Sequence, residues 1–310
     1  MNEADVIARL RRHTIDPAAR GLLDDVALLD GLVITHDTIA EGVHFLPFDP
    51  PASVGWKLVA VNLSDLAAKG ATPAGALLSL TLSADEEWDE EFLGGVEAAC
   101  ESYGLPLIGG DTVALPRGAP RVLGMTAIGR VGGKTPSRAG GEPGDNLWLV
   151  GMLGDAAAGL AQLRAEPKST GALVDVYRRP VPLLAAGQAL ASCARAMMDV
   201  SDGLLLDARR LAEASGCTAV VELGAVPLSE AFRQTRGGSQ EARLFAATGG
   251  DDYALLAALP ADVDPRAFDL PKGSVVTRIG FLEDGGAGLR LVNGGQPVDL
   301  PATLGHEHRG

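Results

Sequence analysis

A glycine- and proline-rich segment near the middle of the chain separates two parts that each alternate between strand-like and helix-like stretches. Residues 132–146 read GGKTPSRAGGEPGDN and contain five glycines and two prolines. This composition interrupts helices and strands and is typical of a linker. On both sides of it, short apolar runs alternate with longer helical patterns, which favours sheets covered by helices. The sequence therefore predicts an α/β (α+β) fold of two domains of similar size.

The expected elements follow from the start and stop signals of helices and hairpins. The dipeptide Asp-Gly at 30–31 would turn a strand pair, Ser53 would cap a helix that runs to residue 69, and Gly104 would end the next helix. A charged helix is expected at the N-terminus. The further expected strands are 74–82, 105–108, 121–131, 147–151, 197–200, 218–223, 253–258, 275–281 and 289–292. The further expected helices are 85–103, one from about 155, 182–194 and 203–215.

The charge balance argues against nucleic acid and membranes as partners. The chain of 310 residues has 26 Lys and Arg against 40 Asp and Glu, a formal net charge of −14. Phosphate backbones and anionic membranes are bound mainly by clustered Lys and Arg. The longest uncharged stretches, 71–84 and 180–194, have 14 and 15 residues, fewer than the roughly 20 that span a bilayer.

The cysteines and the N-terminus indicate a cytoplasmic protein. Cys100, Cys193 and Cys217 are odd in number and lack the spacing of a metal site. The N-terminal segment has no apolar core of a signal peptide. We therefore expect reduced thiols and a cytoplasmic location.

Several aspartates share one sequence context, because each follows or ends an apolar run and stands beside Gly, Ser or Thr. An acid at the end of a buried run is costly unless a positive group compensates it. Small neighbours leave room for an ion and a phosphate, and Mg²⁺ prefers carboxylate, water and phosphate oxygens. The aspartates are Asp24 and Asp25 in GLLDDVALL, Asp37 in VITHDT, Asp65 in VNLSDLAAKG, Asp111 in LIGGDT, Asp199 and Asp202 in MMDVSDGL, and Asp251 and Asp252 in TGGDDYALL.

Other interpretations of these segments are weaker. Each aspartate taken alone fits a helix cap or a turn, but the recurrence of the context favours a shared site. Residues 129–135 are similar to a phosphate-binding P-loop, yet Ile128 stands where that motif needs Gly and Pro136 prevents a helix from starting cleanly. No G-x-S-x-G motif of a serine hydrolase is present. A metal- and phosphate-using enzyme is the class that remains.

The ordered motifs strongly resemble the thiamine-monophosphate kinase family. They are LDDVALL, ITHDTIAEGVHF, VNLSDLAAKGATP, LIGGDT, SRAGGEPGD, MDVSDGL and GGDDYALL, and the likeness runs from about Gly21 to Gly305. The superfamily includes aminoimidazole ribonucleotide synthetase, selenophosphate synthetase and a hydrogenase maturation factor. The resemblance implies a two-domain, aminoimidazole ribonucleotide synthetase-like fold and a homodimer. Residues 1–138 would form the ATP- and Mg-binding dimerisation domain, and residues 139–310 would close the active-site cleft.

The resemblance also implies an activity and a set of site residues. ATP would be the co-substrate in a direct phosphorylation of thiamine monophosphate to thiamine diphosphate, with several Mg²⁺ ions. Carboxylates alone repel a polyphosphate, so the acids themselves predict metal dependence. The residues carried over by motif are the metal ligands Asp24, Asp37, Asp65, Asp111, Asp199 and Asp202, the ATP-binding residues Gly110, Asp111, Arg138 and Ser201, and the substrate-binding residues His44, Asp251 and His306, with Asp111 and Asp202 as the expected catalytic residues.

Three positions depart from the family pattern. His36 stands where many relatives have Ser or Thr, and Ala254 stands where Glu is usual. His306 takes the place of an aromatic residue, where it either stacks on the thiamine or belongs to a frayed tail.

Two alternative functions remain open at the level of sequence. A superfamily relative that uses ATP as a synthetase is one, although selenophosphate synthetases carry an N-terminal Cys or selenocysteine and the first cysteine here is Cys100. A non-catalytic scaffold for metals or nucleotides is the other, and it predicts binding without turnover.

Overall fold

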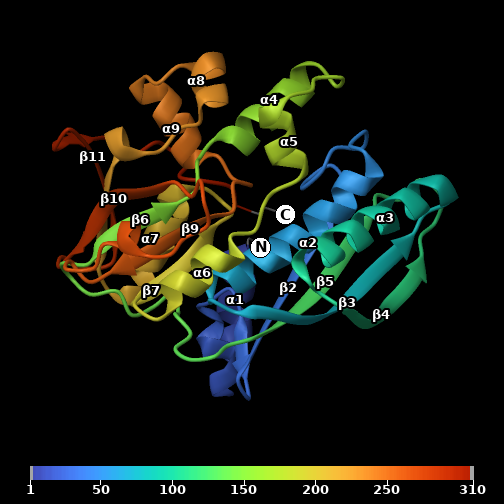
Figure 1. The fold of residues 1–310 in the computed structure, drawn as a ribbon, viewed down its shortest axis with the longest axis horizontal. Coiled ribbons are helices and arrows are strands. Elements are labelled where there is room, and N and C mark those ends of the chain that lie inside the picture. Colours follow the sequence, from blue (N-terminus) through green and yellow to red (C-terminus); the bar gives the residue numbers. More distant parts are fainter. Residues whose placement is uncertain (1–2, 308–310) are drawn as a thin grey trace.

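The two halves of the chain form two separate β-sheets (Figure 1). The computed structural model describes residues 3–307. The five strands of the first sheet lie within 27–130, and the seven strands of the second lie within 146–298. The predicted α/β (α+β) class is therefore confirmed. The glycine-rich stretch 132–146 leads from the first sheet to the second.

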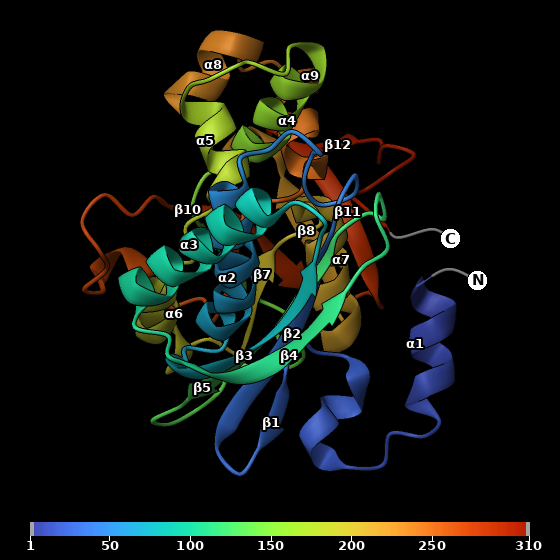
Figure 2. The ribbon, with the colours of Figure 1, turned by 90° about the vertical axis from the view of Figure 1, so that its right-hand side faces the viewer.

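The first sheet has one face covered by helices and one open face. Its strand order is β1-β2-β5-β3-β4, and only the pair β3–β4 is parallel. Helices α2 and α3 cover one face (Figure 2). The two helices approach closely at Gly95 of α3, which has no side chain. A Cβ at this position would lie 2.0 Å from the carbonyl oxygen of Ala52. The elements of this half are α1 (Glu3–Arg11), a 3-10 helix (Pro17–Leu22), β1 (Ala27–Leu29), β2 (Leu32–Ala40), α2 (Pro51–Ala68), β3 (Thr72–Leu82), α3 (Glu86–Tyr103), β4 (Leu107–Ala114) and β5 (Val122–Arg130).

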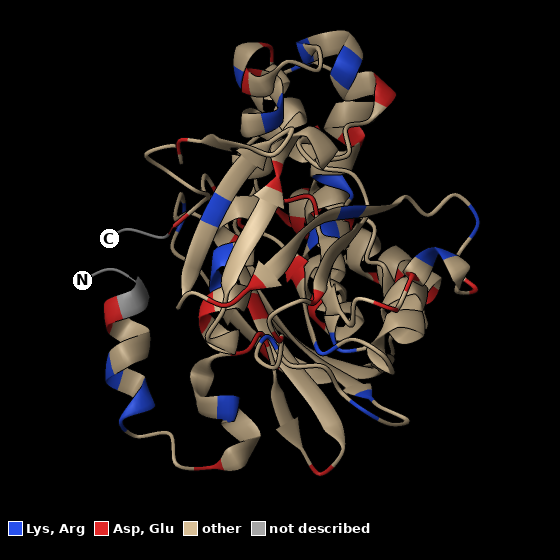
Figure 3. Cartoon of the chain, turned by 90° about the vertical axis from the view of Figure 1, so that its left-hand side faces the viewer, with Lys and Arg blue, Asp and Glu red and all other residues tan. Residues whose placement is uncertain are grey.

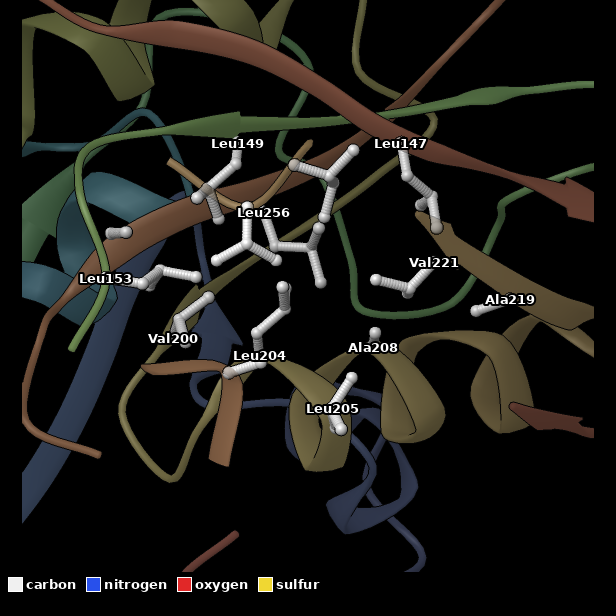
Figure 4. Close-up of a cluster of buried hydrophobic side chains, with 14 of the residues drawn as sticks. Leu147, Leu149, Leu153, Val200, Leu204, Leu205, Ala208, Ala219, Val221 and Leu256 are labelled. Carbon is white, nitrogen blue, oxygen red and sulfur yellow. The ribbon is translucent and has the colours of Figure 1, made fainter. Parts of the chain in front are cut away.

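The second sheet has helices on both faces. Its strand order is β12-β11-β8-β10-β6-β9-β7. Leu147 and Leu149 of β6 pack toward α7 in the core that Figure 4 shows, whereas Trp148 and Val150 pack toward α6. The elements are β6 (Asn146–Val150), α4 (Asp155–Ala165), α5 (Ala172–Arg178), α6 (Leu184–Ala191), β7 (Ala196–Val200), α7 (Leu204–Ser215), β8 (Thr218–Glu222), α8 (Glu230–Arg236), α9 (Gln240–Thr248), β9 (Ala254–Leu259), β10 (Val276–Glu283), β11 (Gly288–Asn293) and β12 (Gln296–Val298), with 3-10 turns at Leu223–Ala225 and Pro265–Ala267.

Helix α2 lies between the two sheets and is buried almost all round. Fifteen of its 18 residues are buried. It contacts β2, β5 and α3 on one side and α6, β7 and β9 on the other. Buried polar side chains need partners, and α2 carries Lys57, Asn62, Ser64 and Asp65. Among residues 3–307, no helix is long and apolar enough to cross a membrane.

The local signals at several element ends are confirmed, and one is wrong. Gly104 ends α3 in the left-handed conformation with φ 62°, and Asp85 caps the same helix. The Asp-Gly turn at 30–31 joins β1 to β2. The predicted cap Ser53 is wrong because α2 begins at Pro51, whose fixed φ suits a first helical turn. Ser53 lies inside that turn and accepts a hydrogen bond from Nε of Arg179 at 3.4 Å.

Strand β4 differs most from the expectation. It runs over Leu107–Ala114 rather than ending near 108, and all eight of its residues are exposed. Within residues 3–307 it is the edge of the sheet and pairs only with β3. The strand has two central glycines and is exposed along its whole length. It therefore lacks the alternation of apolar and polar residues by which a half-buried strand is recognised in sequence. The short elements α5, α8, α9 and β12 are also absent from the expected set.

Candidate active site

Three carboxylates from three different elements meet between the two sheets. Asp25 precedes β1, Asp65 lies on α2 and Asp199 lies on β7. One carboxylate oxygen from each residue lies within 4.8 Å of the other two. Asp65 and Asp199 are buried and Asp25 is half-buried. Three hard oxygen donors at this separation fit a divalent cation such as Mg²⁺.

Two of the three carboxylates, Asp65 and Asp199, lack a compensating positive charge. Burial and the nearby Asp37 and Asp199 raise the pKa of Asp65 well above its ordinary value, and Thr35 donates a hydrogen bond to it. Burial and Asp25 raise the pKa of Asp199 to about 8, although Ser64 Oγ donates to its Oδ2 at 2.6 Å. A cation between Asp65 and Asp199 would favour the charged form of both carboxylates.

Asp25, rather than its predicted neighbour Asp24, belongs to this carboxylate group. The ammonium of Lys69, which is fully buried, lies 2.6 Å from Oδ1 of Asp24 and 2.9 Å from Oδ2 of Asp25. Arg20 pairs with the other oxygen of Asp24, whose side chain is only 1% exposed. Asp24 is thus enclosed by the protein's own cations, whereas Asp25 also faces the other acids.

Arg138 reaches this group from the glycine-rich segment. Its Nη2 donates to Oδ1 of Asp25. Burial would raise the pKa of Asp25, but Arg138 and Lys69 hold it well below its ordinary value. The Nε atom of Arg138 is buried and has no hydrogen-bond partner within residues 3–307. An unsatisfied buried N–H of a guanidinium beside carboxylates fits a phosphate oxygen.

Asp37 lies at the margin of the same group. Burial and the neighbouring carboxylates of Asp25 and Asp202 raise its pKa to about 6. Its backbone amide donates to Oδ1 of Asn62 on α2 at 3.0 Å, which fixes β2 against the helix. The structure therefore brings Asp37 near the predicted ligands Asp65, Asp199 and Asp202.

The loop between β7 and α7 carries Ser201 and Asp202. Asp202 pairs with Arg210, and its amide donates to the buried Asp207 at 3.1 Å. The Ser201 carbonyl accepts from the Asp251 amide at 2.8 Å. The amide of His306 donates to the Asp202 carbonyl at 2.9 Å, so the C-terminal segment is docked on this loop at His306. This hydrogen bond argues against a frayed tail at His306, one of the two alternatives that the sequence left open.

Gly110 and Asp111 lie apart from the other predicted residues. Asp111 pairs with Ser79, Ser79 with Gly124 and Gly124 with Thr38, so three strand spacings separate Asp111 from β2. At about 4.8 Å per spacing this is roughly 14 Å. Asp111 also shares the open face of the sheet with these partners, because Gly110 pairs with the buried Leu78. Any cation that Asp111 binds is therefore separate from one bound by Asp65.

His44 and Asp251 come together through a third residue. His44 follows β2, and its Nδ1 accepts from the Ala40 amide at 3.0 Å. Asp251 precedes β9 and has a positive φ of 69°. Lys57 of α2 donates to the carbonyl of His44 at 3.0 Å and to Oδ2 of Asp251 at 2.8 Å. The two predicted substrate residues thus meet around one ammonium.

The positions that depart from the family pattern have local explanations. The His36 ring points to the open face of the sheet, where it lies 2.9 Å from Oγ1 of Thr126 and 3.2 Å from Oγ1 of Thr38. Thr35 points inward to Asp65 instead. Ala254 is buried at the start of β9. The His36 side chain therefore lies outside the carboxylate group.

Several acidic and basic segments lie close together near the centre of the molecule (Figure 3). Lys57, Lys69, Arg138 and Arg210 each contact a predicted acidic residue or its neighbour. Sequence reasoning identified only Arg138 among these cations. The arrangement can bind cations between Asp25, Asp65 and Asp199 and phosphate groups next to them, as phosphoryl transfer requires.

Comparison with known proteins places the chain in a family. The N-terminal domain model of AIR synthase related proteins matches residues 23–131, and the C-terminal domain model matches residues 142–289. Thiamine-monophosphate kinase of Salmonella typhimurium is 39% identical, over 97% of this chain and 94% of its own.

Solved structures agree with this relationship. AaThiL complexed with AMPPCP and TMP matches with a TM-score of 0.86 and 30% identity, covering 99% of this chain and 97% of the other. Thiamine-monophosphate kinase from Stenotrophomonas maltophilia K279a matches with a TM-score of 0.75 and 37% identity, covering 95% and 96%. The two-domain AIR synthase-like fold is therefore confirmed, and the chain belongs to the thiamine-monophosphate kinase family.

Proposed function

We propose that this protein transfers the γ-phosphoryl group of ATP to thiamine monophosphate, releasing thiamine diphosphate and ADP. The family membership and the likeness to a structure that holds AMPPCP and TMP support this activity. The observation that carries it for this chain is the group of Asp25, Asp65 and Asp199 between the two sheets. Such a group offers a metal-dependent route to phosphate binding without a P-loop.

Mg²⁺ fits the donor set of this site. Asp25, Asp65 and Asp199 would hold one ion, and Asp37 and Asp202 would complete the sites of others. When bound, Mg²⁺ neutralises the charge of the phosphates and of the transferring group. Lys69 and Arg138 hold Asp25 in place by ion pairs to its two oxygens.

The two halves would divide the work of binding. Residues 1–138 would supply most of the ATP and Mg²⁺ contacts, with Gly110 and Asp111 on the open face of the first sheet. Residues 139–310 would close the cleft and add Ser201, and Arg138 at the boundary would donate Nε to a phosphate oxygen. Asp202 would act as a catalytic residue beside the transferring group, whereas the predicted catalytic role of Asp111 is not supported within one chain, because Asp111 lies on the open face of the first sheet, apart from the carboxylate group.

The acceptor would bind near His44, Asp251 and His306. His44 and Asp251 share Lys57, and His306 is docked on the Asp202 loop. The acceptor phosphate would thus lie next to the carboxylate group. In-line transfer depends chiefly on such positioning and on charge stabilisation.

We infer a homodimer formed by the N-terminal halves. Strand β4 is an exposed edge with an apolar surface, in which Leu107, Ile108 and Val113 are 43%, 59% and 49% exposed. Proteins seldom leave such an edge uncovered. Light scattering on the purified protein is expected to give twice the chain mass of 31.8 kDa, about 64 kDa, and a mass of one chain at micromolar concentration would refute the dimer.

A direct assay tests the activity. With ATP, Mg²⁺ and thiamine monophosphate, the protein is expected to form thiamine diphosphate and ADP in equal amounts, as measured by chromatography. Chelation with excess EDTA is expected to abolish turnover, because the carboxylates then repel the polyphosphate. Binding of ATP without formation of thiamine diphosphate would contradict the kinase activity and favour a scaffold. Consumption of ATP with a phosphate acceptor other than thiamine monophosphate would favour a synthetase.

We further propose that the reaction takes place in the cytoplasm. Cys100, Cys193 and Cys217 are all free thiols, which supports a reducing compartment.

A further inference from the structure

Lys57 is a buried cation whose contacts join the two halves of the chain. It is the seventh of the 18 residues of α2, and its side chain is 2% exposed. Its ammonium donates to the carbonyl of His44 at 3.0 Å and to Oδ2 of Asp251 at 2.8 Å. It also lies 4.2 Å from the centre of the Tyr177 ring, a cation–π distance. A buried ammonium with this full set of partners has a fixed position.

The acidic partner of Lys57 is held in a conformation that needs support. Asp251 has a φ of 69° and Tyr253 a φ of 52°, in the left-handed region that residues with a Cβ seldom occupy. The hydroxyl of Tyr253 donates to Oδ1 of Asp251 at 2.9 Å, while Lys57 binds Oδ2. Both carboxylate oxygens are thus fixed, although the side chain remains 25% exposed.

A second set of contacts encloses Lys57 from the C-terminal half. Tyr177 and Arg178 of α5 donate to Asp49 at 3.3 Å and 2.8 Å. The space beside the ammonium, lined by Phe45, Asp49 and Tyr177 among others, has a volume of only about 10 Å³. This volume admits at most one water molecule. Lys57 therefore acts on a substrate only through the residues that it holds.

We propose that Lys57 is the positioning residue of the acceptor site, fixing His44 and Asp251 relative to each other and offsetting the charge of Asp251 toward the acceptor phosphate. This inference rests on the proposed function, which places the acceptor at His44 and Asp251. The charge argument is direct, because an unpaired carboxylate near a phosphate monoester repels it and a paired one does so far less. ATP binds at other residues and is not expected to depend on Lys57.

The test compares Lys57→Met with a matched control from the same cluster. Lys57→Met keeps the length of the side chain and removes its charge. Its KM for thiamine monophosphate is expected to rise by about 10- to 100-fold, as for the loss of groups that position a binding residue. Its KM for ATP is expected to stay within about twofold of the wild type. The control Asp49→Asn weakens the Tyr177 and Arg178 contacts but touches neither His44 nor Asp251, so both KM values are expected to stay near those of the wild type.

The outcomes separate this inference from the proposed function. Calorimetric titration of Lys57→Met with thiamine monophosphate is expected to show the same weakening as KM, whether or not the variant is less stable. An active wild type together with an unchanged KM in Lys57→Met overturns the role of Lys57 alone. Equal increases in both KM values, or the same increase in Asp49→Asn, overturn it as well, because they indicate a general structural effect. A wild type that neither binds nor phosphorylates thiamine monophosphate overturns both proposals.

Discussion

Asp199→Asn is expected to lower turnover by about 10²- to 10³-fold while raising the stability of the metal-free protein. Asp199 is 3% exposed and shares a space with Asp25 and Asp65. Loss of one charged ligand weakens the electrostatic stabilisation of the transferring group, which accounts for the loss in rate. Without metal, the same substitution removes a repulsion between buried carboxylates. The hydrogen bond from Ser64 remains, because the Asn oxygen also accepts it.

The stability of the metal-free protein is expected to fall as pH rises from about 4 to 8. The pKa of Asp199 is about 8 in the folded protein and 3.8 ordinarily. Between these values the folded chain binds a proton that the unfolded chain has released, so folding is favoured at the acidic end and this contribution is lost as pH rises through 8. Thermal melts in EDTA across this range measure the slope. Asp199→Asn is expected to show a shallower slope, and saturating Mg²⁺ is expected to have the same effect on the wild type.

Asp24→Asn is the matched control for Asp199→Asn. The side chain of Asp24 is 1% exposed but pairs with Lys69 and Arg20, so its loss removes an acidic partner from each of two cations. We expect a lower melting temperature of Asp24→Asn in EDTA, the opposite sign to Asp199→Asn. Destabilisation of the metal-free protein by both substitutions would contradict the assignment of Asp199 to an uncompensated acidic site.

Lys69→Met is expected to destabilise the protein by about 3–5 kcal/mol, the usual effect of removing one partner from a buried ion pair. The Lys69 side chain is 0% exposed, and its ammonium binds Asp24, Asp25 and the carbonyl of Met197 at 3.0 Å. The methionine would leave this carbonyl without its donor and would remove one of the two cations that pair with each acid, since Arg20 remains at Asp24 and Arg138 at Asp25. Urea unfolding in EDTA gives the free energy of unfolding directly.

Lys168→Met provides the comparison, because Lys168 is exposed. Its effect on the free energy of unfolding is expected to stay within about 0.5 kcal/mol. Added Mg²⁺ is expected to recover part of the stability that Lys69→Met loses, since a divalent ion can take the place of the missing charge beside Asp25. A loss in Lys69→Met no larger than that in Lys168→Met would show that Lys69 is not needed to compensate the two acids.

The sequence predicted the class of the fold and most long elements, because their signals are local. The pattern of α3, with Asp85 and Gly104 at its ends, is complete within 20 residues. The positions of the acids relative to these elements were predicted less well. They were expected at the ends of apolar runs, but Asp37, Asp65 and Asp199 lie inside β2, α2 and β7. The packing of helices and strands against each other determines which partners surround a buried acid. A local sequence pattern does not contain this information.

Most of the cations of the site could be identified only from the tertiary structure. Lys57 and Lys69 lie in or directly after a helix that is otherwise almost free of charge, and this contrast is a signal that sequence reasoning could have used, since a buried helix retains a charge only with a partner. The choice between Asp24 and Asp25 had no such signal. It depends on Arg20, which is close in sequence, and on Lys69, which is 44 residues from Asp25.

Lys57, beside the proposed acceptor site, and Asp65, in the proposed metal site, both lie on α2. The spacing between the two sites along this helix is therefore set by a single helix. The two residues are eight positions apart, which corresponds to about 12 Å along the helix axis. Relative movement of the two sheets would open or close the cleft without changing this length. The separation between Lys57 and Asp65 is therefore fixed by the rise of α2 and stays the same in the open and the closed protein.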